Sequence, residues 1–300
     1  MPAYTFTVMN PPDSLDPRAA RLQAQRRARS GSPHFLQQTV ERGLLERLEP
    51  VRLAPKRIIV SPAATSSELL PLRQRFPEAE LLACDVQSNG LARLRERLSP
   101  ARGFFARLRR MREEPVARFV AADPLRLPFA SASADLVLSA LALHSCPSPE
   151  AQIAEWRRVL RPGGLLAFAC LGVDTLAELR RLGARMQAFP DMHDLGDMLV
   201  GQGLAEPVVD TARVTVTWRD PQTLLAEVRQ WGGNARPDRF RGLLTPRHRR
   251  EWLAAIESLR GADGLISLTV ELVHGHAWCP AERRLPEGFA PIRVMRPGER

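Results

Sequence analysis

Several kinds of residue are scarce in this chain of 300 amino acids, which has one tyrosine, one lysine (Lys56) and four cysteines. The cysteines are Cys84, Cys146, Cys170 and Cys279, and no two of them form a Cys-x-x-Cys pair. Zinc knuckles and disulfide frameworks need closely spaced or paired cysteines, so the sequence argues against both. We expect reduced, buried thiols and no bound metal.

Long apolar segments are also missing. The longest apolar run covers residues 165–173, about half of the roughly 20 residues that a membrane-spanning helix needs. Residues 1–10 show no basic segment followed by an apolar one, so no secretory signal is visible. We therefore expect a cytoplasmic protein that has no membrane partner.

The chain has neither a Gly-x-Ser-x-Gly elbow nor a Walker loop, which argues against a hydrolase and against a nucleoside triphosphatase. Its 44% hydrophobic and 25% charged residues are typical of an ordinary folded protein. The net charge of +10 suits an acidic partner. Because nearly all basic residues are arginines in a chain rich in alanine, leucine and proline, this charge is typical of compositional bias, and we expect no specific nucleic-acid binding.

Predicted strands and helices alternate along most of the chain. The expected strands cover residues 57–60, 80–85, 116–121, 135–139 and 165–170, and the expected helices cover residues 34–48, 68–76, 88–98, 150–160 and 175–186. Apolar strands that alternate with helices predict an α/β, doubly wound parallel sheet with both faces covered. Residues 213–218 and 265–277 have the strand pattern, with helices over 221–231 and 246–259 between them, and should close the same sheet.

The domain is expected to cover residues 34–280. Residues 1–33 are rich in arginine and proline, and a helix-compatible stretch over residues 16–29 is poorly apolar, so we expect a flexible N-terminal arm. A flexible tail is expected over residues 281–300. Residues 99–114 indicate a surface insertion, either a solvated helix face or a surface that steers an acidic partner, with Arg102, Arg107, Arg109, Arg110 and Arg112.

Two carboxylates follow predicted strands, and sheets of this kind bind ligands at the carboxyl ends of their strands. Asp85 ends the second strand, where it either accepts hydrogen bonds from the two hydroxyls of an adenosine ribose or caps the next helix. Asp123 ends the third strand, where it either binds the amine of an adenine or forms a plain Asp-Pro turn. The sequence therefore predicts a nucleoside site with a structural alternative for each residue.

His144 is a candidate for the same site, because it follows the fourth predicted strand and either lines the site or lies in a turn. His193 lies between two aspartates, in a segment that we expect to form a loop and a helix cap, with Asp194 as the N-cap.

His274 and His276 share one face of a predicted strand, and with Cys279 they have ligand chemistry for a metal. Because a fourth ligand is missing, we expect no metal at these residues.

Residues 119–168 read FVAADPLRLPFASASADLVLSALALHSCPSPEAQIAEWRRVLRPGGLLAF. This stretch resembles class I S-adenosylmethionine-dependent methyltransferases, and the Arg-Pro-Gly-Gly turn at residues 161–164 is its most specific part. The later strings CLGVDTLAELRRL, DMHDLGDMLVGQGLAEPVVD, TWRDP, WGGNARP and VELVHGHAW are similar to the biotin-pathway malonyl-carrier-protein O-methyltransferases. This second resemblance runs over about residues 34–278.

The resemblance implies a Rossmann-like, mostly parallel seven-stranded sheet with an antiparallel closing strand. It also implies that S-adenosylmethionine is the cofactor and that the acceptor is the free carboxylate of a malonyl thioester on acyl carrier protein, a step toward a biotin precursor. The implied cofactor-binding residues are Ser61, Ala63, Asp85, Val86, Asp123, Pro124 and Ser139, and the substrate-side candidates are His144 and His193. A carboxylate acceptor is already ionised near neutral pH and needs no general base, so no residue is assigned as catalytic.

The chain departs from the family at the loop after the first strand. The family has a glycine-rich Asp-x-Gly-x-Gly-x-Gly loop there, whereas residues 60–67 read VSPAATSS, without glycine or acid. The usual N-terminal Tyr-Asp element is also not recognisable, and a similar arginine-rich arm occurs in relatives of a mitochondrial NADH dehydrogenase assembly factor. Two hypotheses follow, an active methyltransferase and a non-catalytic relative that acts as a binding or assembly module.

Overall fold

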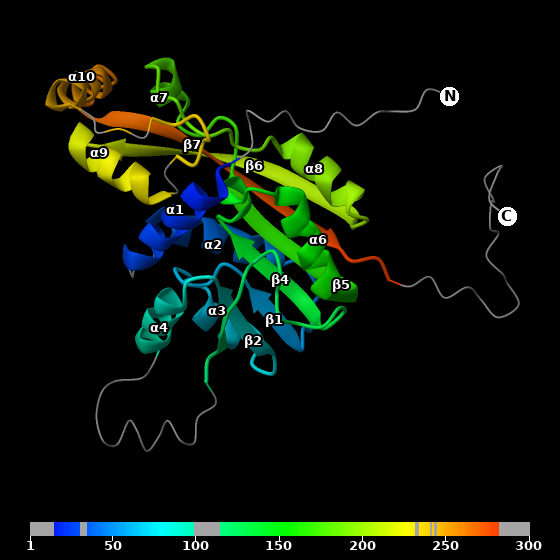
Figure 1. The fold of residues 1–300 in the computed structure, drawn as a ribbon. Coiled ribbons are helices and arrows are strands. Elements are labelled where there is room, and N and C mark those ends of the chain that lie inside the picture. Colours follow the sequence, from blue (N-terminus) through cyan, green and yellow to red (C-terminus); the bar gives the residue numbers. More distant parts are fainter. Residues whose placement is uncertain are drawn as a thin grey trace, which may run out of the picture.

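The computed structural model describes residues 15–30, 35–98, 115–231, 234–240, 242 and 245–281 (Figure 1). The start of the predicted arm, the predicted basic insertion with its arginines, and the predicted tail beyond residue 281 lie outside the described residues. No helix in the described ranges is both long enough and apolar enough to cross a membrane.

Within these residues seven strands form one sheet in the order β3-β2-β1-β4-β5-β7-β6. The strands are β1 (Arg57–Val60), β2 (Glu80–Asp85), β3 (Arg118–Ala121), β4 (Ala134–Ala140), β5 (Leu160–Leu171), β6 (Ala205–Trp218) and β7 (Ile266–Trp278). Strands β1 to β5 pair in parallel, and β7 is antiparallel to both of its neighbours. The predicted doubly wound sheet with an antiparallel closing strand is therefore confirmed.

Helices cover both faces of this sheet (Figure 1). The helices are α1 (Pro17–Ser30), α2 (Phe35–Leu48), α3 (Leu69–Arg75), α4 (Ser88–Arg97), α6 (Pro149–Val159), α7 (Ala177–Arg181), α8 (Met192–Gly201), α9 (Pro221–Val228) and α10 (Pro246–Glu257), with short 3₁₀ turns η2 (Leu143–Ser145) and η3 (Arg229–Trp231). Successive strand side chains point to opposite faces, so Ile58 packs in the core with α2, α3 and α4, and Ile59 in the core with α6 and α8.

Two glycine positions fix how β5 pairs with β7. Gly163 has a φ of 78° in the turn before the paired part of β5, and its N–H donates to Cys279 O at 2.9 Å. Gly275 of β7 lies against the Phe168 ring, and a Cβ at this position would come within 2.3 Å of that ring. The Arg-Pro-Gly-Gly and His-Gly-His-Ala-Trp strings therefore serve the packing of the sheet.

Three local predictions differ from the structure. The predicted helix over residues 175–186 ends at Arg181, because Gly183, with a φ of 91°, terminates it. Strand β6 begins at Ala205, well before residue 213, because its many exposed polar residues hide the strand pattern of an edge strand. The N-cap of α8 is Asp191 and not Asp194, since the Asp191 carboxylate accepts a hydrogen bond from His193 N at 2.8 Å.

Part of the predicted N-terminal arm forms helix α1 and contacts the domain. Asp16 caps helix α1, its N–H donates to Ala235 O at 2.7 Å, and its carboxylate pairs with Arg239 at 2.8 Å. Ala19 and Ala20 are buried against this anchor. Small residues and an ion pair dock the helix, which is why an apolar pattern did not reveal it.

Candidate functional site

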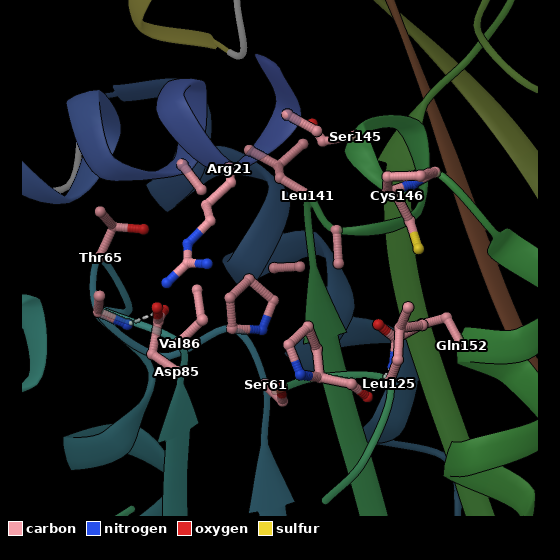
Figure 2. A pocket seen from close by; sticks show the side chains of 18 of the residues that line it. Arg21, Ser61, Thr65, Asp85, Val86, Leu125, Leu141, Ser145, Cys146 and Gln152 are labelled. Atoms are coloured by element: carbon pink, nitrogen blue, oxygen red, sulfur yellow. Dashed lines mark hydrogen bonds between the residues drawn. The ribbon is translucent and has the colours of Figure 1, made fainter. Parts of the chain in front are cut away.

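A cavity of about 490 Å³ opens beyond the carboxyl ends of β1, β2 and β4 (Figure 2). Strand β1 lies between β2 and β4, so the cavity is at the point where the chain switches from one half of the sheet to the other. Its volume falls within the range of about 300–1,000 Å³ that is usual for small-molecule sites. Its position and size are those of a ligand site in a doubly wound sheet.

Most of the predicted cofactor-binding residues line this cavity, namely Ser61, Asp85, Val86, Asp123 and Pro124. Ala63 and Ser139 do not line it, because they are 0% and 1% exposed behind its wall. Their neighbours Ala64 and Ala140 line it instead, as expected where adjacent side chains point in opposite directions. At these two positions the residue next to the predicted one lines the cavity, and cofactor binding by all of these residues stays a prediction.

The two histidine candidates lie elsewhere. His144 is buried in the wall of a second cavity, where its Nδ1 accepts from Leu171 N at 3.4 Å and its ring is 5.9 Å from the Phe189 ring. His193 is at the start of α8 with its side chain 79% exposed, and its ring nitrogen contacts Asp191. The structure therefore does not bring His193 to either cavity.

The Asp85 carboxylate accepts hydrogen bonds from the loop after β1 and from the turn after β2. Its Oδ2 accepts from Ala64 N at 2.9 Å, and its Oδ1 accepts from Gln87 N at 2.8 Å. A carboxylate offers about four lone-pair sites, and hydroxyl groups are donors that it can accept from. Asp85 thus has a structural role, and ribose binding by Asp85 stays a prediction.

Asp123 lies in an Asp-Pro turn, the structural alternative that the sequence offered for it. Its Oδ1 accepts from Leu125 N at 2.9 Å, and the following Pro124 O accepts from the Gln152 side chain at 2.7 Å. This turn places Asp123, Pro124 and Leu125 together in the cavity wall. The Asp-Pro turn thus exists, and it presents a carboxylate and two apolar side chains to the cavity.

Most backbone amides of the glycine-free loop, residues 61–67, donate hydrogen bonds to acceptors within the protein. They join Ser61 N to Leu138 O at 3.0 Å, Ala63 N to Cys84 O at 2.9 Å, Ala64 N to Asp85 Oδ2 at 2.9 Å, Ser66 N to Ala63 O at 2.9 Å and Ser67 N to Glu41 Oε2 at 2.8 Å. Pro62 has no N–H to donate. Thr65 N is therefore the one loop amide with no acceptor among the described residues.

Two buried carboxylates lie beneath this loop. Glu41 of α2 is 2% exposed and accepts from Ser67 N, from Ser67 Oγ and from Gln37 Nε2 at 2.6 Å. Glu68, also 2% exposed, follows the loop directly. Burial raises the pKa of Glu41, and burial together with the Glu41 charge raises the pKa of Glu68 well above its usual value. We call Glu41, Glu68 and Gln37 the loop brace.

The sequence reasoning missed the loop brace and a second part of the cavity wall. Gln37 and Glu41 are four residues apart and interrupt the apolar stripe of α2, which was the available signal. Arg21 of α1 and Trp231 of η3 also line the cavity, and Figure 2 shows Arg21 reaching from α1 toward Asp85 and Thr65. No local pattern predicts that these distant segments meet.

The second cavity has a volume of about 180 Å³ and shares Trp231 with the first. Its walls are mainly apolar, with Leu171, Leu176, Met186, Phe189 and Trp252 among them. Arg229 and His144 add polar groups. The first cavity combines charged and apolar groups at the strand ends, and the second is a mainly apolar cavity that shares Trp231 with it.

Known methyltransferases are similar to this chain in sequence, and solved structures are similar to it in fold. The methyltransferase domain family matches residues 63–168, from the glycine-free loop to β5. The malonyl-acyl-carrier-protein O-methyltransferase of Laribacter hongkongensis is 39% identical over 255 residues, covering 83% of this chain and 84% of that protein. The enzyme of the same name from Gallionella capsiferriformans is 36% identical over 289 residues, covering 93% and 97%.

The chain belongs to the malonyl-acyl-carrier-protein O-methyltransferase family. Membership in this family confirms the resemblance found in the sequence and makes the protein a methyltransferase. The solved structure of the YcgJ protein from Bacillus subtilis is similar in fold, with a TM-score of 0.55 at 14% identity, over 80% of this chain and 98% of that one.

Cys146 carries the one thiol among the described residues that line the first cavity. Cys146 lines the first cavity, but burial raises the pKa of its thiol to about 11, and the thiol donates to Ser148 O at 3.3 Å. A thiol of this kind is not ionised at neutral pH. In the part of the chain that the structure describes, no group of three or more His, Cys, Asp or Glu side chains is placed to hold a metal ion.

Proposed function

We propose that this methyltransferase uses S-adenosylmethionine to methylate the free carboxylate of a malonyl thioester carried by an acyl carrier protein. The observation that carries the proposal is the 490 Å³ cavity with Asp85 and Asp123 at neighbouring strand ends, in a chain of this family. The chemistry of the cavity walls fits the cofactor, since acceptors for hydroxyls and amines, an arginine and apolar side chains all face one space.

The residues that would hold the cofactor follow from their groups. Asp85 has acceptor capacity for the ribose hydroxyls, and Asp123 can accept from the adenine amine. Val86 and Leu125 offer apolar surface to the faces of the adenine ring. S-adenosylmethionine supplies a methyl group on a positively charged sulfur.

The protein's task in this reaction is alignment and not proton transfer. A carboxylic acid with a pKa of about 4 is already ionised at neutral pH, so the acceptor needs no general base. This agrees with a cavity whose thiol, Cys146, is neutral. Holding two reactants in a near-attack arrangement can itself supply much of the rate.

The second cavity suits the acceptor. Its apolar walls can exclude water from the thioester arm, and Arg229 in its lining can bind the malonyl carboxylate through two parallel hydrogen bonds. Trp231 stands in the walls of both cavities, so an acceptor beside it would also be beside the cofactor. We therefore assign the first cavity to the cofactor and the second to the acceptor.

The net charge of +10 supports an acidic carrier protein as partner. Replacing Arg107, Arg109 and Arg110 with glutamine should slow association with the carrier at low salt and have less effect at high salt. Stopped-flow association rates at several salt concentrations would measure this. Equal rates at low salt would remove the insertion from carrier recognition.

Transfer of a labelled methyl group tests the function. The purified protein is incubated with methyl-labelled S-adenosylmethionine and malonyl-carrier protein, and acetyl-carrier protein serves as an acceptor without a free carboxylate. We expect label on the malonyl carrier alone, and its loss in Asp85→Asn. Asp197→Asn, an exposed carboxylate on α8, is the matched control, and melting temperatures check folding.

Cofactor binding without transfer to the malonyl carrier would instead favour the non-catalytic alternative, a binding or assembly module. Absence of cofactor binding in the wild-type protein would contradict the proposal altogether.

A further inference from the structure

We infer that Arg21 of α1, and not the loop after β1, binds the carboxylate in the amino-acid portion of the cofactor. The inference rests on the proposed use of S-adenosylmethionine. It assigns a binding function to the N-terminal arm and not to the loop of residues 61–67.

The loop has few donors left for an anion. Its amides at Ser61, Ala63, Ala64, Ser66 and Ser67 donate to protein acceptors, and Pro62 has none. Only Thr65 N has no acceptor within the described ranges. A single amide is a weak site for a carboxylate, because the carboxylate loses its hydration when it binds. The loop brace keeps this arrangement in place, because Glu41 occupies Ser67 N and Ser67 Oγ.

Arg21 faces the same space from the opposite wall. In Figure 2 its side chain extends from α1 into the cavity, with the guanidinium toward Asp85 and Thr65. No carboxylate of the described residues lies within the 4.0 Å ion-pair distance of this guanidinium. A guanidinium binds a carboxylate through two parallel N–H bonds, about twice as strong as neutral hydrogen bonds.

The charges in the cavity are divided between its walls. Asp85 and Asp123 lie at the strand ends, and Arg21 is the one arginine among the described residues that line this cavity. The acidic wall repels an anion and accepts from hydroxyls and amines. A ligand with a nucleoside at one end and a carboxylate at the other therefore matches the two walls.

The helix that carries Arg21 is anchored to the domain by protein contacts. Asp16 joins α1 to Ala235 and Arg239, and Ala19 and Ala20 pack beside Ala235. Because the backbone is already fixed, only the long side chain is ordered on binding, which limits the entropic cost. Cofactor binding should in turn hold α1 against the domain.

Calorimetric titration tests this with two ligands, S-adenosylhomocysteine and 5′-methylthioadenosine, which keeps the nucleoside and thioether but has no carboxylate. Arg21→Gln should weaken S-adenosylhomocysteine binding by about 10- to 100-fold, the usual effect of a lost charged hydrogen-bond pair. Binding of 5′-methylthioadenosine should stay unchanged. Arg21→Lys should recover part of the loss, and Arg18→Gln, an exposed arginine of the same helix outside the cavity lining, should lose nothing.

Each other outcome overturns the inference in a distinguishable way. Unchanged S-adenosylhomocysteine affinity in Arg21→Gln removes the assignment and leaves the proposed function standing. An equal loss for both ligands means that the variant disturbed the cavity and that the carboxylate has no special partner. Absence of S-adenosylhomocysteine binding in the wild-type protein overturns the proposed function together with the inference.

Discussion

The loop after β1 and the middle of strand β7 are both tightly packed, but they are held by different forces. The loop has no glycine and lies against the buried loop brace, in which the Glu41 carboxylate accepts hydrogen bonds from the loop. Strand β7 retains Gly275, and the Phe168 ring fills the space where a Cβ would be. The hydrogen bonds to Glu41 depend on the protonation state of a buried carboxylate, whereas the fit of Gly275 against Phe168 is steric. The two regions should therefore fail under different perturbations.

The steric region should show the largest effect. Gly275→Ala places a Cβ within 2.3 Å of the Phe168 ring, which is fully buried and stacks on Trp156. We expect a loss of about 3 kcal/mol in the free energy of unfolding, measured by denaturant titration, because a packed core tolerates added atoms poorly. Gly196→Ala in α8 is the control, since nothing lies within 4 Å of its Cβ position. Equal stability of the two variants would contradict the steric account.

Breaking the loop brace should have the next largest effect. Glu41→Ala leaves Ser67 N and the Gln37 amide without their acceptor, at a cost of about 2 kcal/mol. Cofactor affinity should fall as well, because the loop loses a fixed shape. Glu46→Ala, an exposed glutamate of the same helix, should change neither quantity. A Glu41→Ala protein as stable as Glu46→Ala would show that the loop does not need the brace.

Acid should act on the β7 region through His274. Burial, with a smaller effect of the Arg47 charge, lowers the pKa of His274 to about 4, although Asp210 lies 3.8 Å away and His276 is next on the same face. The unfolded chain takes up this proton near pH 6.5, before the folded chain does, so stability falls as pH drops from about 6.5 toward 4. We expect a loss of about 1 kcal/mol or more over this window and a weaker pH dependence in His274→Asn. If the stability of the wild type and of His274→Asn changed identically with pH, His274 would not be the group responsible for the acid sensitivity.

The loop region should respond in the opposite direction and by the smallest amount. Glu68 has a raised pKa, so the unfolded chain loses its proton first, and the stability that Glu68 contributes at low pH is lost as pH rises through the folded value. Glu68→Gln removes the titrating carboxyl group. The melting temperature of this variant should therefore exceed that of the wild type by a few degrees near pH 8 and by less near pH 5. A constant difference at all pH values would mean that Glu68 does not titrate in this way.

The sequence predicts the parts of the fold that depend on local pattern. Strands β1 and β2 begin and end at the residues expected, because short apolar runs bounded by turn residues determine them. The sequence also predicts that Asp85 and Asp123 lie close together, because a parallel sheet brings the ends of its strands to one edge, and both line the first cavity.

Contacts between distant segments could not be predicted in this way. Arg21 and Trp231 lie far apart in the chain and share one cavity, which no local pattern encodes. Helix α1 docks through alanines and an ion pair, so it lacks the apolar stripe by which buried helices are recognised. His193 has the chemistry of a site residue, but only the position of α8 shows that it faces solvent.

The contact between Glu41 and Ser67 also constrains how this chain can evolve. Ser67→Gly takes away the Oγ donor of Ser67 and leaves the buried Glu41 carboxylate less satisfied, while Glu41→Ala strands the donors of the present loop. Because Ser67 and Glu41 share one hydrogen-bond network, we expect the effects of changes at the two positions to be non-additive. The residue at position 67 of the loop is thus tied to the residue at position 41 of helix α2.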